Sequence, residues 1–310
     1  MKAKRILISL GGNALGTDPA PLVETAQTIA APLATLVSQG YEIVLCHGNG
    51  PQVGMIKTGL DGGRKPQGQD PIPLADCVAM SQSYMGYHIQ DALENALRDL
   101  GSDASVVTVV SRCLVDPADP GFQHPTKPIG AFLSKEEGEK LSALGKTVIE
   151  DSGRGYREVV ASPIPLSIVE EKAILALVEA GQIVLAGGGG GIPAVLKGNK
   201  IEPIDAVIDK DWVSVLLAAA VKADALVILT GVEKVAVGFN TPNQKWLDEI
   251  NRAEAEGYIA AGEFPAGSML PKVQAALKFV ASGDNRKTLI TSLDRLVEGL
   301  AGETGTWITA

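Results

Sequence analysis

The most informative stretch of the sequence is a run of five glycines, Gly187 to Gly191, that directly follows the apolar residues 183–186. The apolar residues predict a buried strand, and the glycines predict a turn whose backbone N–H groups lie bare. Bare amides at the carboxyl edge of a parallel sheet bind phosphate or carboxylate well, because they rearrange little when the charge arrives. A simple structural turn is the alternative, although such a turn seldom needs so many consecutive glycines. We therefore predict an anion-binding turn here.

Two further glycine turns follow apolar stretches near the N-terminus. Residues 4–10 predict a strand that ends at Gly11-Gly12-Asn13-Ala14, and residues 41–46 predict a strand that ends at His47-Gly48-Asn49-Gly50. The carboxyl ends of neighbouring parallel strands meet at one edge of a doubly wound sheet. We therefore expect these three turns to converge there and to hold oxygens of a small anionic substrate.

Three lysines, Lys127, Lys210 and Lys272, stand in apolar or turn-forming surroundings. Phosphoryl transfer needs little covalent help from a protein and much electrostatic stabilisation, which amides and lysines supply. Each lysine also has a plainer interpretation: Lys127 as a surface loop residue, and Lys210 as a solvated neighbour of a helix N-cap at Asp211. Lys272 lies near a predicted helix start, where a cation opposes the helix dipole unless an anion binds there.

Asp209 precedes Lys210 directly, and we expect it to orient the site instead of serving as a nucleophile. Neighbouring side chains diverge in a strand or its immediate turn, so Asp209 should not neutralise Lys210 by lying against it.

Several familiar sites are excluded by their missing motifs. No Gly-x-Gly-x-x-Gly or Gly-x-x-x-x-Gly-Lys-Ser/Thr pattern occurs, which disfavours a Rossmann dehydrogenase and a P-loop enzyme. The protein-kinase motifs are also missing. The three histidines have no metal-ligand spacing, and the three cysteines lie far apart, so we expect no metal site and no disulfide framework. For His47 we expect a structural or backbone hydrogen-bonding role.

The composition bounds the class of protein. With 310 residues, 45% of them hydrophobic, the chain can fill one large α/β domain or two moderate ones. A net charge of −9 argues against a nucleic-acid partner and favours a small-molecule substrate. The apolar runs at 6–10 and 213–221 are too short for a signal peptide or a membrane span, so we expect a cytoplasmic protein with no membrane partner.

Strands and helices are predicted to alternate along the chain. Strands are expected at 104–110, 225–230 and 287–291, and helices at 22–37, 74–100, 212–223 and 267–281, with a surface loop at 62–73. Ser167-x-x-Glu170 predicts a capped helix that runs to Ala180. This alternation favours an α/β fold with a mostly parallel sheet covered on both faces.

Residues 115–161 are expected to leave the main sheet as a small protruding subdomain. Prolines break the periodicity around Lys127, the capping box Ser134-x-x-Glu137 predicts a short helix, and strands are expected at 146–150 and 158–161. We expect this subdomain to act as a lid that delivers Lys127 to the acceptor site. A decorative surface insertion is the alternative.

These motifs together resemble the carbamate kinases of the amino acid kinase family. The resemblance spans nearly the whole chain, and the Pro-Thr-Lys-Pro-Ile-Gly and Gly-Arg-Gly-Tyr segments are its most specific parts. The matching segments are Gly11 to Ala14, His47 to Gly54, Pro125 to Gly130, Gly153 to Arg157, Gly187 to Pro193, Ile208 to Asp211 and Gly267 to Lys272.

The resemblance implies an open three-layer αβα sandwich, usually homodimeric. Residues 1–223, including the 115–161 lid, would form the acceptor part, and residues 224–310 the nucleotide-binding part. The implied reaction is reversible phosphoryl transfer between ATP and carbamate, run towards ATP from carbamoyl phosphate and ADP, with Mg²⁺ accompanying the nucleotide. Arginine or purine and allantoin catabolism is the implied setting.

The residue roles follow from the matched motifs. The residues expected to be catalytic are Lys127, Lys210, Lys272, Asp209 and Asn13. Those expected to bind the acceptor substrate are Gly11, Gly12, Gly48, Asn49, Gly50, Gly188 and Gly189. Those expected to bind the nucleotide are Thr230, Gly231, Val232, Ser268, Met269 and Lys272.

Three residues on the nucleotide side depart from the family pattern. Ala236 and Gly238 stand where such kinases commonly have tyrosine and asparagine, and Leu270 replaces a glycine. Two alternatives therefore stay open. One is another acyl-phosphate-forming amino acid kinase, although no additional basic motif for a second carboxylate is present. The other is a nucleotide- or carbamoyl-phosphate-binding regulator that lacks turnover.

Overall fold

A mostly parallel sheet forms the centre of the molecule. The computed structural model describes residues 4–11, 19–151, 153, 155–265 and 267–310. Within them, eight strands pair in the order β15-β17-β16-β12-β1-β2-β9-β3, and every pair is parallel except β16 with β17. The bounds are β1 Arg5–Leu10, β2 Glu42–His47, β3 Val106–Thr108, β9 Ile183–Leu185, β12 Ala225–Thr230, β15 Glu249–Asn251, β16 Lys287–Ser292 and β17 Thr306–Thr309.

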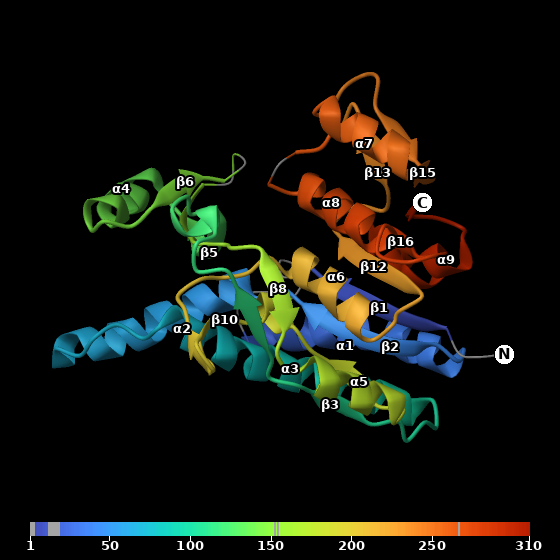
Figure 1. Ribbon diagram of the computed structural model, residues 1–310, viewed down its shortest axis with the longest axis horizontal. Helices are drawn as coiled ribbons and strands as arrows, with labels where there is room; N and C mark the ends of the chain where they lie inside the picture. Colours follow the sequence, from blue (N-terminus) through green and yellow to red (C-terminus); the bar gives the residue numbers. More distant parts are fainter. Residues whose placement is uncertain (1–3, 12–18, 152, 154, 266) are drawn as a thin grey trace.

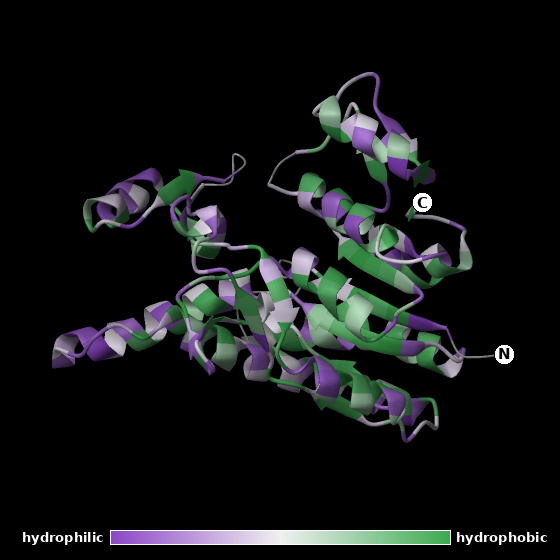
Figure 2. Ribbon diagram, in the orientation of Figure 1, coloured by the Kyte–Doolittle hydropathy of each residue, from purple (hydrophilic) through white to green (hydrophobic). Residues whose placement is uncertain are grey.

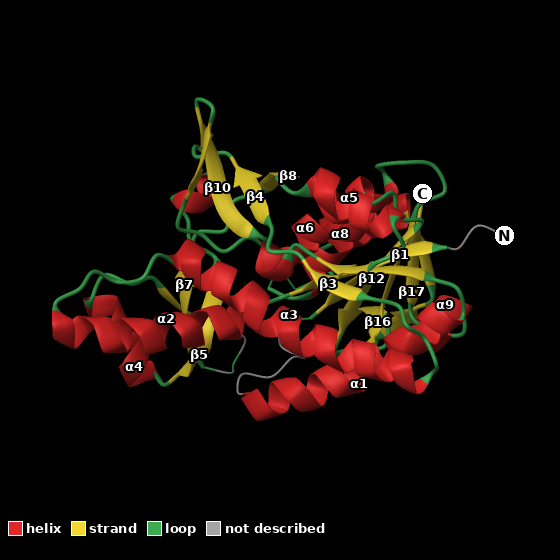
Figure 3. Ribbon diagram, turned by 90° about the horizontal axis from the view of Figure 1, so that it is seen from below, coloured by secondary structure: helices red, strands yellow, loops and turns green. Residues whose placement is uncertain are grey.

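Helices cover both faces of this sheet, because successive side chains of a strand point to opposite sides. In β1, Ile6 and Ile8 belong to one buried core, and Leu7 belongs to the other. The first core includes residues of α1 (Pro19–Ser38), α3 (Leu74–Asp99) and α9 (Leu296–Ala301), and the second includes residues of α5 (Glu171–Glu179), α6 (Lys210–Ala220) and α8 (Met269–Val280). Figure 3 shows the resulting layers, which confirm the predicted αβα sandwich.

The hydropathy of the chain follows this layering. Figure 2 shows apolar residues concentrated in the strands of the central sheet, while the helix surfaces are mixed. Among the residues that the structure describes, no helix is both long and apolar enough to cross a membrane.

Two smaller sheets are built largely from the segment between β3 and β9, and the first also takes two strands that follow β9. One has the order β11-β10-β4-β8, from β4 (Arg112–Val115), β8 (Pro165–Ile168), β10 (Ile192–Lys197) and β11 (Lys200–Pro203). The other has the order β5-β7-β6, from β5 (Lys127–Leu133), β6 (Val148–Glu150) and β7 (Tyr156–Val160), and carries α4 (Lys135–Ala143). This second unit projects from the body of the molecule (Figure 1), and we call it the projecting unit. The predicted capping box at Ser134 is present.

A hairpin and a helix complete the C-terminal region. Strands β13 (Val235–Val237) and β14 (Lys245–Leu247) pair with each other, and α7 (Arg252–Ala260) follows β15. Short 3-10 turns occur at η2 (Lys65–Gln67), η3 (Pro120–Phe122), η4 (Gly188–Gly190) and η5 (Leu293–Arg295).

Three local predictions were wrong. Residues 50–64 form helix α2 (Gly50–Arg64), although its glycines favour a turn and loop locally; packing of Val53 against α3 and Ile129 stabilises the helix. Ser167 lies in β8, and α5 begins after Glu170 without a side-chain cap. The β10–β11 hairpin was not predicted, because β10 carries a continuous apolar run and gives no alternation of apolar and polar residues.

Helix α2 contacts the projecting unit through two glycines. A Cβ atom on Gly54 would lie 2.1 Å from the Cα of Gly130 in β5, so the two backbones approach more closely than any side chain allows. Gly130 also has a φ of +70°, which favours glycine at that position. The close packing of the projecting unit against α2 therefore depends on this pair of glycines.

We predict that Gly54→Ala will lower the free energy of unfolding by about 1–3 kcal/mol, because the added methyl overpacks a backbone contact. Urea unfolding measures the change. Gly59→Ala in the same helix is the control: it faces open space, so it should be neutral or stabilising by up to about 1 kcal/mol. Equal effects from the two substitutions would contradict the proposed contact.

Candidate active site

The predicted glycine turns meet at one edge of the central sheet. Gly11 follows β1, Gly48 follows β2 and Gly187 comes shortly after β9, and these three strands are parallel neighbours. Leu10 pairs with His47 in register, so the first two turns begin at the same level. The structure therefore brings the described parts of all three turns together. Gly12 and Asn13 lie outside the described residues.

The turn at Gly187–Gly191 packs directly against the turn after β2. A Cβ atom on Gly188 would lie 2.5 Å from Nε2 of His47, and one on Gly189 would lie 1.9 Å from Nδ2 of Asn49. Gly189 also has a φ of +62°. The glycines are thus required by close packing and backbone conformation, which accounts for a run longer than a simple turn needs.

The backbone N–H groups of the glycine turn differ in how they are used within the part of the chain that the structure describes. The N–H of Gly187 donates to Ser111 Oγ (2.8 Å), and those of Gly190 and Gly191 donate to carbonyls within the turn. Among the described contacts, the N–H groups of Gly188 and Gly189 have no partner. If the run binds an anion as predicted, these two amides are the donors that would do so.

The turn after β2 contributes differently from the prediction. The N–H of Gly48 donates to the carbonyl of Leu10 (3.1 Å), so it is already used. Asn49 is the N-cap of α2, but its side chain donates to Ser81 Oγ (2.8 Å) and makes no cap hydrogen bond. Gly50 is the first residue of α2, and the N–H of a first helical residue has no partner within the helix.

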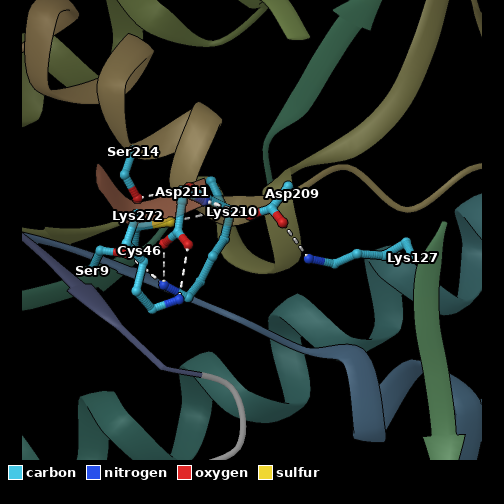
Figure 4. Close-up of polar contacts among 9 residues, drawn as sticks. Ser9, Cys46, Lys127, Asp209, Lys210, Asp211, Ser214 and Lys272 are labelled. Carbon is cyan, nitrogen blue, oxygen red and sulfur yellow. Dashed lines mark hydrogen bonds and ion pairs between the residues drawn. The ribbon is translucent and has the colours of Figure 1, made fainter. Parts of the chain in front are cut away.

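Lys210, Asp211 and Lys272 form a cluster where two helices begin, and we call it the lysine cluster. The Nζ atom of Lys210 lies 2.7 Å from Oδ1 of Asp211 and donates to Ser9 Oγ (2.8 Å). The Nζ atom of Lys272 lies 3.1 Å from Oδ2 of the same carboxylate. Figure 4 shows both ammonium groups converging on Asp211, which joins the start of α6 to the start of α8.

Lys210 and Asp211 are both charged at neutral pH. Burial alone would lower the pKa of Lys210, but the charge and the hydrogen bond of Asp211, with smaller contributions from Cys46 and Asp209, together outweigh burial and raise this pKa. Burial likewise opposes the ionisation of Asp211, yet Lys210 and Lys272 hold the pKa of its carboxyl well below its usual range. Two lysines share one carboxylate, so the cluster carries a surplus positive charge for an anion.

Asp209 connects the projecting unit to α6. It is the N-cap of α6: its Oδ1 atom accepts a hydrogen bond from the N–H of Asp211 (2.9 Å). Its Oδ2 atom lies 2.7 Å from Nζ of Lys127, the first residue of β5. The placement of a helix N-cap at Asp211, with a solvated Lys210, was wrong: Lys210 is only 8% exposed.

His47 has the expected backbone hydrogen-bonding role. Burial lowers the pKa of its imidazole to about 4, so the ring is neutral at pH 7. The Nδ1 atom lies 3.1 Å from the carbonyl oxygen of Gly48, which places the ring proton on Nδ1. Within the described ranges, no group of three or more His, Cys, Asp or Glu residues could hold a metal ion.

The residues predicted to bind nucleotide lie in two places. Thr230 ends β12 beside β1, and Gly231 and Val232 follow it. Ser268 is the N-cap of α8 and its side chain makes no cap hydrogen bond, while Met269 packs on the core. No described hydrogen bond or ion pair joins these two places directly. Lys272, in the first turn of α8, connects the second place to Asp211.

Sequence reasoning missed two residues of this site, Asp211 as the shared partner of two lysines and Ser9 as a hydrogen-bond acceptor for Lys210. Asp211 follows Lys210 directly, and that adjacency was the available signal. The position of Ser9 at the end of a buried strand carried no such signal.

Comparison with known proteins agrees with this geometry. The model of the amino acid kinase family matches residues 4–292. The carbamate kinase of Clostridium perfringens is 47% identical over 311 residues, covering 98% of this chain and 99% of that protein. The carbamate kinase-like protein YqeA of Escherichia coli is 47% identical over 307 residues, covering 99% of each chain.

Solved structures show the same relationship. The carbamate kinase from Giardia lamblia bound to citric acid superposes with a TM-score of 0.93 at 38% identity, over 99% of this chain and 98% of that one. The same enzyme bound to AMP-PNP gives a TM-score of 0.88 at 39% identity, with the same coverage. The chain therefore belongs to the amino acid kinase family, and within that family to the carbamate kinases. This confirms the family and fold expected from the sequence.

We predict that Asp211→Asn will lower the free energy of unfolding by about 3–5 kcal/mol, because it leaves the buried ammonium of Lys210 without its counter-charge. Chemical denaturation monitored by circular dichroism measures the effect. The control is Glu136→Gln, which removes the exposed partner of Lys140 and should cause no measurable change. An Asp211→Asn protein as stable as the wild type would contradict the buried ion cluster.

Proposed function

We propose that the lysine cluster is the phosphoryl-transfer centre of this enzyme and that it works mainly from carbamoyl phosphate and ADP towards ATP and carbamate. The protein is an ATP-dependent phosphotransferase with a carboxyl-type acceptor, a carbamate kinase. The observation that carries the assignment of the centre is the convergence of Lys210 and Lys272 on the single carboxylate of Asp211. The proposed direction rests on chemistry: an acyl phosphate transfers its phosphoryl group more readily than ATP does.

The chemical step needs stabilisation of charge on the oxygens of the phosphoryl group. Lys210 is buried and held by Ser9 and Asp211, so its charge is positioned before substrate arrives and little reorganisation is needed. The free amides of Gly188 and Gly189 supply further fixed donors near the adjoining strand ends. Asp209 orients Lys127 through its ion pair and does not act as a nucleophile.

The nucleotide is assigned to the C-terminal part. We place its phosphates near the start of α8, where Lys272 and the uncapped helix end favour an anion. The binding of AMP-PNP, an ATP analogue, to the related Giardia lamblia enzyme supports nucleotide binding as such. Mg²⁺ would be held mainly through phosphate oxygens, because lysines already occupy the carboxylates of Asp209 and Asp211.

The division of labour and the assembly belong to the same proposal. Residues 1–223 would hold carbamate or carbamoyl phosphate, and residues 224–310 would hold ATP or ADP. We further propose a cytoplasmic homodimer. The resemblance to carbamate kinases supports each of these points.

The wild-type protein should form ATP from ADP and carbamoyl phosphate in a coupled assay, and Lys210→Met should lower kcat by about 10²- to 10³-fold, because a preorganised positive donor is lost. Lys197→Met is the control: Lys197 pairs with Glu202 on an exposed strand and should leave turnover unchanged. Binding of carbamoyl phosphate without ATP formation would favour a regulator instead of an enzyme. ATP formation only from another acyl phosphate would favour a different kinase of the family.

Lys127→Ala should lower turnover by about 10²-fold while the melting temperature stays nearly unchanged, because Lys127 would contact substrate from the projecting unit. Its ion pair with Asp209 is a quarter exposed and adds little to stability. Lys140→Ala, on α4 of the same unit, is the matched control and should change neither quantity. If turnover and carbamoyl phosphate affinity both keep their wild-type values in Lys127→Ala, the lid role is wrong.

A further inference from the structure

Two adjacent residues of α3, Ser81 and Gln82, contact both glycine turns from inside the protein. Their relative exposures are 0% and 1%. The hydroxyl of Ser81 accepts a hydrogen bond from Nδ2 of Asn49 (2.8 Å) and donates to the carbonyl of Val78 (2.7 Å). A single turn of one helix therefore supports the residues that form the edge of the active site.

Both the Nε2 and the Oε1 atom of Gln82 form hydrogen bonds with the backbone of the turn region. Its Nε2 atom donates to the carbonyls of Gly188 and Ser111, each at 3.0 Å, and its Oε1 atom accepts from the N–H of Ser111 (2.8 Å). The opposite orientation of the amide would set an oxygen against two carbonyl oxygens, so the partners define one orientation. Gln82 thus makes three buried hydrogen bonds, all to backbone atoms.

Ser111 completes the attachment at the other end of the turn. Its hydroxyl accepts the N–H of Gly187 (2.8 Å), and its carbonyl also accepts the N–H of Ile192 (2.8 Å). The thiol of Cys46 donates to the carbonyl of Gly187 (3.2 Å). The backbone of the turn is therefore held by hydrogen bonds at Gly187 and at Ile192, on either side of the amides of Gly188 and Gly189.

These attachments determine where the free amides point. In a trans peptide the C=O and the following N–H point in opposite directions. A hydrogen bond from Gln82 to the carbonyl of Gly188 therefore turns the N–H of Gly189 away from α3. The same carbonyl also accepts the N–H of Gly191 (3.0 Å), so removing Gln82 takes away one of the two hydrogen bonds that fix this peptide plane. Glycines have more backbone freedom than other residues, so the plane would then be less firmly oriented.

We propose that Gln82 is a positioning residue for phosphoryl transfer: by holding the Gly188–Gly189 peptide, it aims the N–H of Gly189 at the oxygens of the transferring group. This inference rests on the proposed function of the site. Gln82 does not contact substrate. It acts through the backbone of the glycine turn, and its effect falls on charge stabilisation in the transition state.

The test compares Gln82→Met with Gln90→Met in the assay of ATP formation. Methionine keeps the length of the side chain and removes its hydrogen bonds. We expect Gln82→Met to lower kcat by about 10- to 100-fold, somewhat less than the loss of a direct donor, with KM for ADP within about twofold of wild type. Gln90 lies further along α3 and its Oε1 atom accepts from the N–H and the hydroxyl of Thr108 (3.2 and 3.1 Å), so it is a matched anchor away from the turn. Gln90→Met should retain wild-type kcat.

A second variant keeps the test decisive if Gln82→Met folds poorly. Ser111→Ala removes the acceptor of the Gly187 N–H together with the hydrogen bond from this hydroxyl to the carbonyl of Val109 (3.0 Å). It keeps the backbone groups of Ser111 that bind Gln82, so it should also lower kcat while leaving KM for ADP unchanged. Amide hydrogen exchange should become faster in residues 187–191 of both variants and remain unchanged in residues 106–108.

The outcomes separate this inference from the proposed function. If the wild type forms no ATP, the proposed function fails. If the wild type is active and Gln82→Met or Ser111→Ala keeps wild-type kcat, the positioning role of this network is wrong. Equal losses in Gln82→Met and Gln90→Met would also overturn it, because general destabilisation of α3 would then explain both.

Discussion

The shared carboxylate of Asp211 is the interaction on which the rest of the site depends. Two helix starts, each carrying a lysine, would repel one another and oppose their own dipoles if no anion lay between them. Asp211 joins them and keeps Lys210 charged although this lysine is buried. The surplus positive charge of the cluster is the property that a transferring phosphoryl group would use, so the structural interaction and the proposed chemistry share the same atoms.

Close packing of the glycine turns adds a second constraint. Side chains at Gly188 and Gly189 would overlap His47 and Asn49, so the two turns interlock without room for substituents. Burial lowers the pKa of His47 to about 4, so its ring is neutral at pH 7 and no charge is buried where it packs against Gly188. Gln82 and Ser111 then hold the interlocked backbone from α3 and from the segment that leads to the projecting unit. The proposed contribution of this turn to anion binding would therefore come from backbone geometry, beside the charge that the lysine cluster supplies.

The nucleotide side shows how the departures from the family pattern are accommodated. Gly238 has a φ of +58°, a conformation that asparagine also adopts more readily than most residues. Ala236 pairs across the hairpin with Trp246, so a large aromatic lies opposite the small residue. Leu270 packs against the core, and its N–H donates to the carbonyl of Pro265 (3.1 Å). The local backbone therefore forms regular structure around all three residues.

Local patterns in the sequence determined the α/β fold, the strands that end in glycine turns and the capped helix α4, because periodicity and turn chemistry are properties of neighbouring residues. They also identified Lys127, Lys210 and Lys272 as unusual. They did not predict α2, whose glycines disfavour a helix until α3 and β5 pack against it. Only the tertiary structure decided which carboxylate each lysine meets: Asp209 turns to Lys127 and Asp211 to Lys210 and Lys272. Contacts between residues far apart in the chain depend on tertiary packing and cannot be predicted from local patterns. The hydrogen bond from Gln82 to the glycine turn is such a contact, so only the structure revealed it.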